Sequence, residues 1–191
     1  MLSVEAMVDA LNRYIDGKDN NRPAVLKALY CSDAVLAFSL DDQSMSFPTR
    51  VEGAQEIAKV LSGDFNQRYQ RVKTWYLTQP VADGTDQVTE QPWLVMMQEK
   101  ASGDIRIGCG FYNWRFETNC NPLQVSAHHI HIHTMLSFPS TRESWLIELQ
   151  QSLAYPWSSV DLVEAQIAPY SELDSIVRYL TQRSEANGGS N

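Results

Sequence analysis

Residues 123–137, LQVSAHHIHIHTMLS, form the last of four long β-prone runs, and these runs decide how the chain folds. The other three runs extend over approximately 71–82, 88–99 and 104–117. Turn residues such as Asp83-Gly84 and Ser102-Gly103 separate neighbouring runs. Long strands that are joined by short turns pair antiparallel with their neighbours in sequence. The sequence therefore predicts an antiparallel meander.

Helical periodicity flanks the meander on both sides. Apolar residues recur at helical spacing in three segments before it, and Ser3 is placed to cap the first of them. Three further segments with the same spacing follow the meander. The six segments cover 4–15, 24–30, 54–61, 143–153, 158–167 and 171–180. This order predicts an α+β fold, with helices before the sheet and a helical extension after it.

The composition is that of an ordinary globular protein. The chain has 191 residues, 43% hydrophobic and 20% charged, which is enough to bury a core without disulfides. A net charge of −8 argues against general binding to nucleic acid or anionic lipid. The widely spaced Cys31, Cys109 and Cys120 predict free thiols. No secretory signal pattern and no membrane-spanning run is present in the sequence, so we expect a cytoplasmic protein.

Three stretches resemble features of the nuclear transport factor 2-like superfamily, which includes SnoaL-like polyketide cyclases and ketosteroid isomerases. Residues 30–36, YCSDAVL, are similar to the entry of that family into its first strand. Residues 51–57, VEGAQEI, are similar to the start of its third helix, and 125–133, VSAHHIHIH, resemble the last strand of SnoaL-like members.

The resemblance covers about residues 1–138 and implies a cone-shaped, curved antiparallel sheet packed against N-terminal helices. It also implies an apolar pocket between sheet and helices, and a homodimer. Residues 139–185 are then a helical extension packed on the same domain, and 186–191 are a flexible tail. The extension could cover the pocket mouth, pack on the sheet or join a dimer contact.

The acid of the ketosteroid isomerases has no counterpart here. The resemblance places it a few residues into the first strand, where the matching register falls near Phe38. This argues against isomerase chemistry of that kind. Asp41 and Asp42 follow slightly further on, and adjacent acids in a polar loop are predicted to be solvated.

All four histidines lie in the last β-run. Because side chains alternate along a strand, His129, His131 and His133 share one face and His128 lies on the other. Imidazole titrates near neutral pH, so the first three are the candidate catalytic residues for acid–base chemistry. The alternative is that hydrogen-bonded histidines line a cavity wall or a dimer face.

A metal site would need ligands from outside this strand. Neighbouring histidines on one face lie about 7 Å apart, so two of them can hold one ion. Cys109 and Glu99 are conceivable further ligands, but no carboxylate or cysteine stands at a spacing that completes the set. We therefore predict no metal and no cofactor.

Aromatic residues in the helices and strands predict either a packed core or the lining of an apolar ligand pocket. The first hypothesis is a protein that binds a small apolar molecule, with acid–base chemistry of the isomerase, cyclase or lyase type. The alternatives are a non-catalytic homodimerisation or protein-interaction module, and a metal-dependent enzyme with a two-histidine strand site. The candidate pocket residues are Tyr14, Phe38, Trp75, Trp93, Phe111, Asn113 and Arg115.

Overall fold

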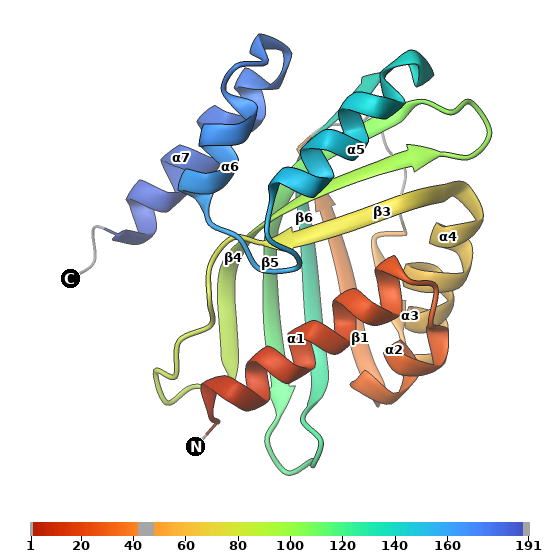
Figure 1. The fold of residues 1–191 in the computed structure, drawn as a ribbon. Coiled ribbons are helices and arrows are strands. Elements are labelled where there is room, and N and C mark those ends of the chain that lie inside the picture. Colours follow the sequence, from red (N-terminus) through yellow and green to blue (C-terminus); the bar gives the residue numbers. More distant parts are fainter. Residues whose placement is uncertain (1, 42–47, 189–191) are drawn as a thin grey trace.

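A computed structural model describes residues 2–41 and 48–188 of the chain (Figure 1). A π-helical segment, Lys59–Asp64, joins α3 to α4, and short 3-10 turns precede α5 and α7. The helices are α1 (Val4–Asp19), α2 (Pro23–Leu29), α3 (Ala54–Ala58), α4 (Phe65–Arg68), α5 (Glu143–Ser152), α6 (Val160–Ile167) and α7 (Asp174–Gly188). The strands are β1 (Tyr30–Leu40), β2 (Arg50–Glu52), β3 (Tyr69–Tyr76), β4 (Gln87–Glu99), β5 (Ile105–Glu117) and β6 (Gln124–Phe138).

The strands form one curved, six-stranded mixed sheet with the order β2-β1-β6-β5-β4-β3. The meander from β3 to β6 is antiparallel, and β2 is antiparallel to β1. Only the pair of β1 and β6 is parallel. These strands are separated in sequence by α3, α4 and the first three strands of the meander, so no hairpin requires them to run antiparallel. The predicted α+β fold with a cone-shaped sheet is confirmed.

Two helix boundaries differ from the sequence-based expectation. The hydroxyl of Ser3 caps α1 as predicted, but the helix continues past Gly17 to Asp19. At its end Lys18 and Asp19 are buried, and their bonds to the sheet hold this last turn. The third helical segment, expected over 54–61, does not end there, because the π-helical segment continues it into α4.

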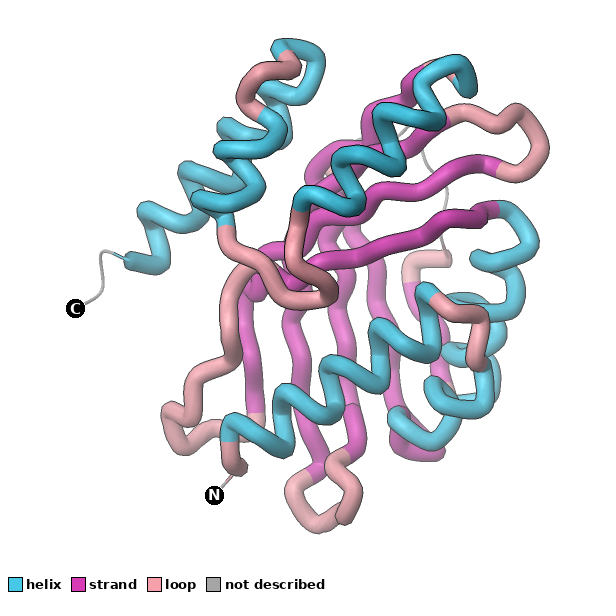
Figure 2. Tube along the Cα trace, viewed as in Figure 1, coloured by secondary structure: helices cyan, strands magenta, loops and turns pink. Residues whose placement is uncertain are grey.

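The sheet separates two hydrophobic cores, and its strands run between two groups of helices (Figure 2). We call the face toward α1–α4 the inner face and the face toward α5–α7 the outer face. Side chains alternate between them along β4: Trp93, Val95 and Met97 belong to the inner core, and Leu94 and Met96 to the outer core. Residues of α5, α6 and α7 pack with sheet residues in the outer core, so the C-terminal extension lies against the sheet.

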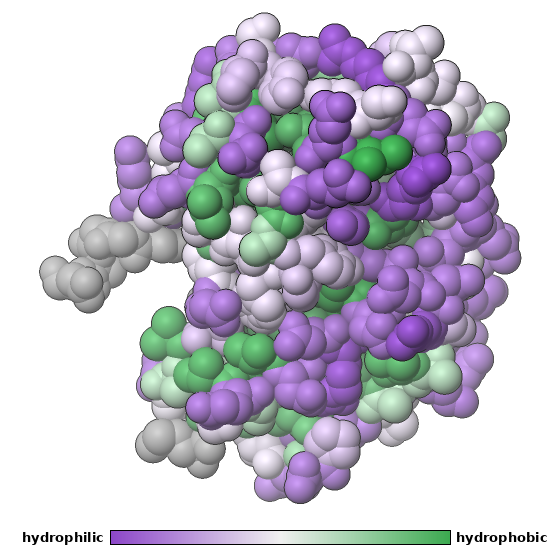
Figure 3. All heavy atoms as spheres, viewed as in Figure 1, coloured by the Kyte–Doolittle hydropathy of each residue, from purple (hydrophilic) through white to green (hydrophobic). Residues whose placement is uncertain are grey.

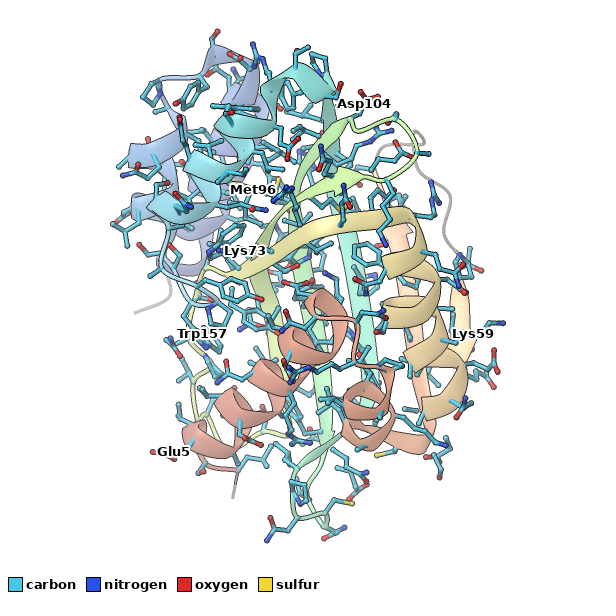
Figure 4. All side chains as sticks on the ribbon, turned by 45° about the vertical axis from the view of Figure 1, so that its right-hand side comes forward. Glu5, Lys59, Lys73, Met96, Asp104 and Trp157 are labelled. Carbon is cyan, nitrogen blue, oxygen red and sulfur yellow. The ribbon has the colours of Figure 1, made fainter. Side chains whose placement is uncertain are left out.

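The connection from α5 to α6 ties the extension to both the sheet and α1. Trp157, labelled in Figure 4, donates its indole N–H to the side chain of Asn12 at 2.8 Å and forms a bridge with Tyr76. The backbone N–H of Tyr76 donates to Pro156, and its carbonyl accepts from Ser158. α7 extends through Gly188, and residues 189–191 of the predicted tail lie outside the described residues.

A β-bulge shapes the strand that carries the histidines. Cys109 pairs with Thr134 but the next residue, Gly110, pairs with Ile132, so β6 has one extra residue, His133. A bulge of this kind bends the strand and changes the direction of its side chains. Alternation places His133 on the side of His131, and the extra residue shifts the alternation after it, so Met135 lies on the inner face with Ile132.

The surface mixes polar and apolar residues, and green apolar groups are separated by purple polar ones in Figure 3. Among the described residues, the large hydrophobic side chains that are exposed are Val81, Tyr155 and Leu162. Within the same residues, no helix combines the length and the apolar content that crossing a bilayer requires.

Candidate functional site

The structure assigns the two faces of the histidine strand. His128 lies on the inner face, buried among aromatic residues of the cone. His129, His131 and His133 lie on the outer face, where they contact Asn113, Ser39 and Asp41. The predicted alternation is present, and the three candidate catalytic histidines point away from the interior of the cone.

The inner face holds an apolar cavity with a volume of about 50 Å³. Tyr14, Phe38 and Trp93 of the predicted pocket residues line it, together with Phe65 and residues of β4 and β6 such as Met97 and Met135. The four other predicted residues do not. Trp75 is part of the outer core, and Phe111, Asn113 and Arg115 pair with the outer-face residues of β6. The predicted set therefore divides between the two faces, because Phe111, Asn113 and Arg115 share the face of β5 that points away from the cavity.

Several residues of the cavity wall carry polar groups, among them Tyr14, Lys18 and Trp93. Lys18 lines it, with its ammonium 4.7 Å from the ring centre of Phe65 and bonded to Asp19 and Thr74, both at 2.8 Å. The indole N–H of Trp93 is buried and has no hydrogen-bond partner among the described residues. A buried donor without an acceptor is costly, and a bound molecule can relieve that cost.

His128 was not among the candidate residues, and it is the imidazole nearest to the cavity. It stacks on Trp114 at 3.6 Å between ring centres and contacts Tyr14 and Tyr112, which line the cavity. Its Nδ1 is 2.7 Å from the hydroxyl of Tyr30, and its Nε2 has no partner among the described residues. Complete burial, with the neighbouring His129, holds the pKa of His128 well below its usual value, so this imidazole is neutral.

The neutral His128 makes the fold sensitive to mild acid. Its pKa in the folded state lies below the unfolded value of about 6.5, so the stabilisation is complete above that pH and is lost as the pH falls below it. We expect the free energy of unfolding to decrease by about 1.4 kcal/mol per pH unit from this group. Urea denaturation at pH 7, 6 and 5 measures the slope. The slope should become shallower in His128→Gln, and parallel slopes for the two proteins would contradict the assignment.

The outer-face histidines form one hydrogen-bonded chain of side chains. The amide nitrogen of Asn113 is 3.2 Å from Nδ1 of His129, whose Nε2 is 2.7 Å from the hydroxyl of Ser39. Ser39 is 2.8 Å from Nδ1 of His131, and Nε2 of His131 is 3.2 Å from the carboxylate of Asp41. The same oxygen of Asp41 lies 2.8 Å from Nδ1 of His133.

Asp41 is the functional candidate that the sequence analysis set aside. The parallel register pairs Ser39 with His131 and Leu40 with Ile132, so Asp41, the residue after β1, lies beside His133. The hydrogen bond from His133, with the nearby His131, lowers the pKa of this carboxyl although about half of the side chain is exposed. Ligand atoms of Asp41, His131 and His133 all lie within 4.8 Å of one another. Asp42 is outside the described residues.

The C-terminal extension supplies one wall of this cluster. Tyr179 of α7 stacks on His133 with ring centres 3.9 Å apart, and Phe111 stacks on His131 at 4.5 Å. The guanidinium of Arg183 lies 4.0 Å from the ring centre of Phe111. Cys109 and Glu99, considered earlier as ligands, do not reach the cluster: Cys109 is buried in the outer core, and Glu99 pairs with Arg106.

Comparison with known proteins shows the fold of the chain. No family model and no curated protein matches it. A nuclear transport factor 2-like superfamily protein from Salmonella enterica serovar Typhimurium is similar in structure, with a TM-score of 0.55 at 14% identity over 66% of this chain and 87% of that one. A hexachlorocyclohexane dehydrochlorinase from Novosphingobium barchaimii has a TM-score of 0.52 at 12% identity over 70% and 88%. A conserved protein from Planctomyces limnophilus has a TM-score of 0.51 at 13% identity over 69% and 95%.

Proposed function

We propose that this chain, which has the nuclear transport factor 2-like fold, binds a small and largely apolar molecule in the cavity on the inner face of the sheet. The observation that carries the proposal is the buried N–H of Trp93, which lines this largely apolar cavity and has no acceptor among the described residues. Pockets that bind small molecules combine apolar walls with a few placed polar groups. The ligand would therefore be apolar with one hydrogen-bond acceptor. That a similar structure is named for hexachlorocyclohexane supports a small apolar ligand for the fold, but not this compound.

The volume of the cavity limits the ligand. Pockets for drug-sized ligands have volumes of about 300–1,000 Å³, and a dry cavity of about 150 Å³ holds benzene. At about 50 Å³, this cavity holds only a compact group, unless its walls move. Met97 and Met135 line it, and unbranched methionine side chains change shape at low cost. A ring-bearing ligand would bind only with such a rearrangement.

Two tryptophans provide a matched test of the ligand. Trp93 and Trp75 are both buried, and neither indole N–H has a hydrogen-bond partner among the described residues, but Trp75 lies on the outer face, away from the cavity. We expect cyclopentanone to bind about tenfold more tightly than cyclopentane, because only the ketone accepts the N–H of Trp93. Trp93→Phe should abolish this preference and Trp75→Phe should retain it. Ligand-dependent thermal shifts and native mass spectrometry measure both.

Xenon provides an independent test of the cavity itself, because this apolar atom occupies small dry cavities in proteins. A crystal under xenon pressure should contain an atom beside Trp93 and Phe38. An empty cavity under xenon, with no thermal shift from either cyclic compound, would refute the proposal.

The homodimer and the cytoplasmic location implied above stay predictions. A dimer formed through the outer face of β1, β6 and β5 would place His129 and Arg115 in the contact. Arg115→Glu would then shift the monomer–dimer equilibrium in sedimentation velocity and leave binding in the cavity unchanged. A sample that is monomeric at all concentrations would exclude the dimerisation module.

A further inference from the structure

We propose that Asp41, His131 and His133 bind a divalent transition-metal ion on the outer face, and that binding reverses the direction of the hydrogen-bonded chain behind them. This site is separate from the cavity, because the sheet lies between the two. The proposal is therefore independent of the function proposed above.

The geometry and chemistry of the three side chains suit such an ion. Two imidazole nitrogens approach one carboxylate oxygen, at 3.2 Å from His131 and 2.8 Å from His133. Ligand atoms around a tetrahedral zinc ion are about 3.3 Å apart, given bonds of about 2.0–2.1 Å, so small side-chain rotations make room for the ion. Imidazole with one carboxylate favours zinc and its neighbours over magnesium or calcium. Three protein ligands leave a further coordination position for water, as in catalytic zinc sites.

The positions of the protons in the chain follow from one backbone group. The N–H of Glu90 donates to the amide oxygen of Asn113 at 2.7 Å, so the amide nitrogen of Asn113 must donate to Nδ1 of His129. Neutral His129 therefore donates through Nε2 to Ser39. The hydroxyl of Ser39 then donates to Nδ1 of His131, and Nε2 of His131 donates to Asp41.

A metal ion needs the opposite arrangement, since a ligating nitrogen offers a lone pair. When the ion binds Nδ1 of His133 and Nε2 of His131, the proton of His133 moves to its Nε2, and the proton of His131 moves to Nδ1 and is donated to Ser39. The hydroxyl of Ser39 turns to Nε2 of His129, and the proton of His129 moves to Nδ1. Nδ1 of His129 then carries a proton and faces the amide nitrogen of Asn113, which is also a donor. The amide group of Asn113 must flip to present its oxygen to His129, and it then loses its hydrogen bond from the backbone N–H of Glu90. No proton is gained or lost along this chain, and the flip weakens metal binding.

Asn113→Asp should remove this obstacle. A carboxylate accepts from both Glu90 and His129, so the reversed chain is then fully satisfied. We expect the variant to bind Zn²⁺ about tenfold or more tightly than the natural chain. Gln87→Glu, which adds the same charge on the outer face opposite Arg115, should change the affinity much less.

Isothermal titration of the untagged chain with Zn²⁺, together with the visible absorption of bound Co²⁺, measures binding. One ion per chain is expected, with affinity lowered at least 100-fold in Asp41→Asn and in His133→Gln. Circular dichroism melting verifies that each variant is folded. Absence of binding at millimolar Zn²⁺, or binding unchanged by these two substitutions, would overturn the site. An Asn113→Asp variant that binds Zn²⁺ no more tightly than Gln87→Glu would overturn the coupling between metal binding and the hydrogen-bonded side chains from Asn113 to His131.

Discussion

Replacing Asp19 by asparagine is expected to destabilise the fold by about 3–5 kcal/mol. Its carboxylate is fully buried and accepts four hydrogen bonds, from Lys18, from the backbone and the hydroxyl of Thr74, and from Tyr155. These contacts join the end of α1 to β3 and to the connection between α5 and α6. An amide presents a donor where the carboxylate presents an acceptor, and it leaves the nearly buried ammonium of Lys18 without a counter-charge.

The matched control is Asp16→Asn in the same helix. Asp16 pairs with Arg22 at the surface, so its loss should change the free energy of unfolding by less than about 1 kcal/mol. Adding Lys18→Met to Asp19→Asn should restore part of the stability, because no unpaired buried charge remains. Guanidinium denaturation measures all of these proteins. Equal effects of Asp19→Asn and Asp16→Asn would show that the buried pair does not hold the helix to the sheet.

Replacing Gly110 by alanine is expected to destabilise the fold by about 3 kcal/mol or more. A Cβ at this position would lie 1.9 Å from the carbonyl oxygen of His131 and 2.8 Å from the ring of Trp93. The carbonyl belongs to the strand paired with Gly110, so relief of the clash requires β5 and β6 to separate at the bulge. The same movement would displace both His131 and the wall of the cavity.

Gly63→Ala is the control for this substitution. A Cβ there meets no atom within 4 Å, so the change should be neutral or slightly stabilising. Denaturation in urea compares the two variants. A Gly110→Ala protein as stable as Gly63→Ala would contradict the close approach of the strands.

Features that depend on local periodicity were predictable from the sequence. The four runs of the meander and the alternation of His128 with His129 follow from the two-residue repeat of a strand. Which of the two faces of the histidine strand lies toward the cavity was not predictable, because this depends on the side of the sheet on which α1 packs. Trp75 and Trp93 look alike in sequence, yet they lie in different cores.

The position of Asp41 beside His131 and His133 could not be predicted, because it depends on pairing between strands that are far apart in sequence. Asp41 reaches His131 and His133 only through the parallel pairing of β1 with β6, strands that the whole meander separates in sequence. The bulge opposite Gly110 shifts the alternation of β6 after His133, so that Met135 lies on the inner face. The sequence does not give the register of this bulge.

The four imidazoles are few enough to be observed individually, and their long-range ¹H–¹⁵N spectra test most directly the division of the histidine strand between its two faces. Without metal, we predict that His129 and His131 are protonated at Nε2, that His133 donates from Nδ1, and that His128 stays neutral at pH values where an ordinary imidazole is protonated, because burial lowers its pKa. One equivalent of Zn²⁺ should move the proton of His131 to Nδ1 and leave the signals of His128 unchanged. A shift of His128 on adding Zn²⁺, or unchanged signals of His131 and His133, would contradict the account.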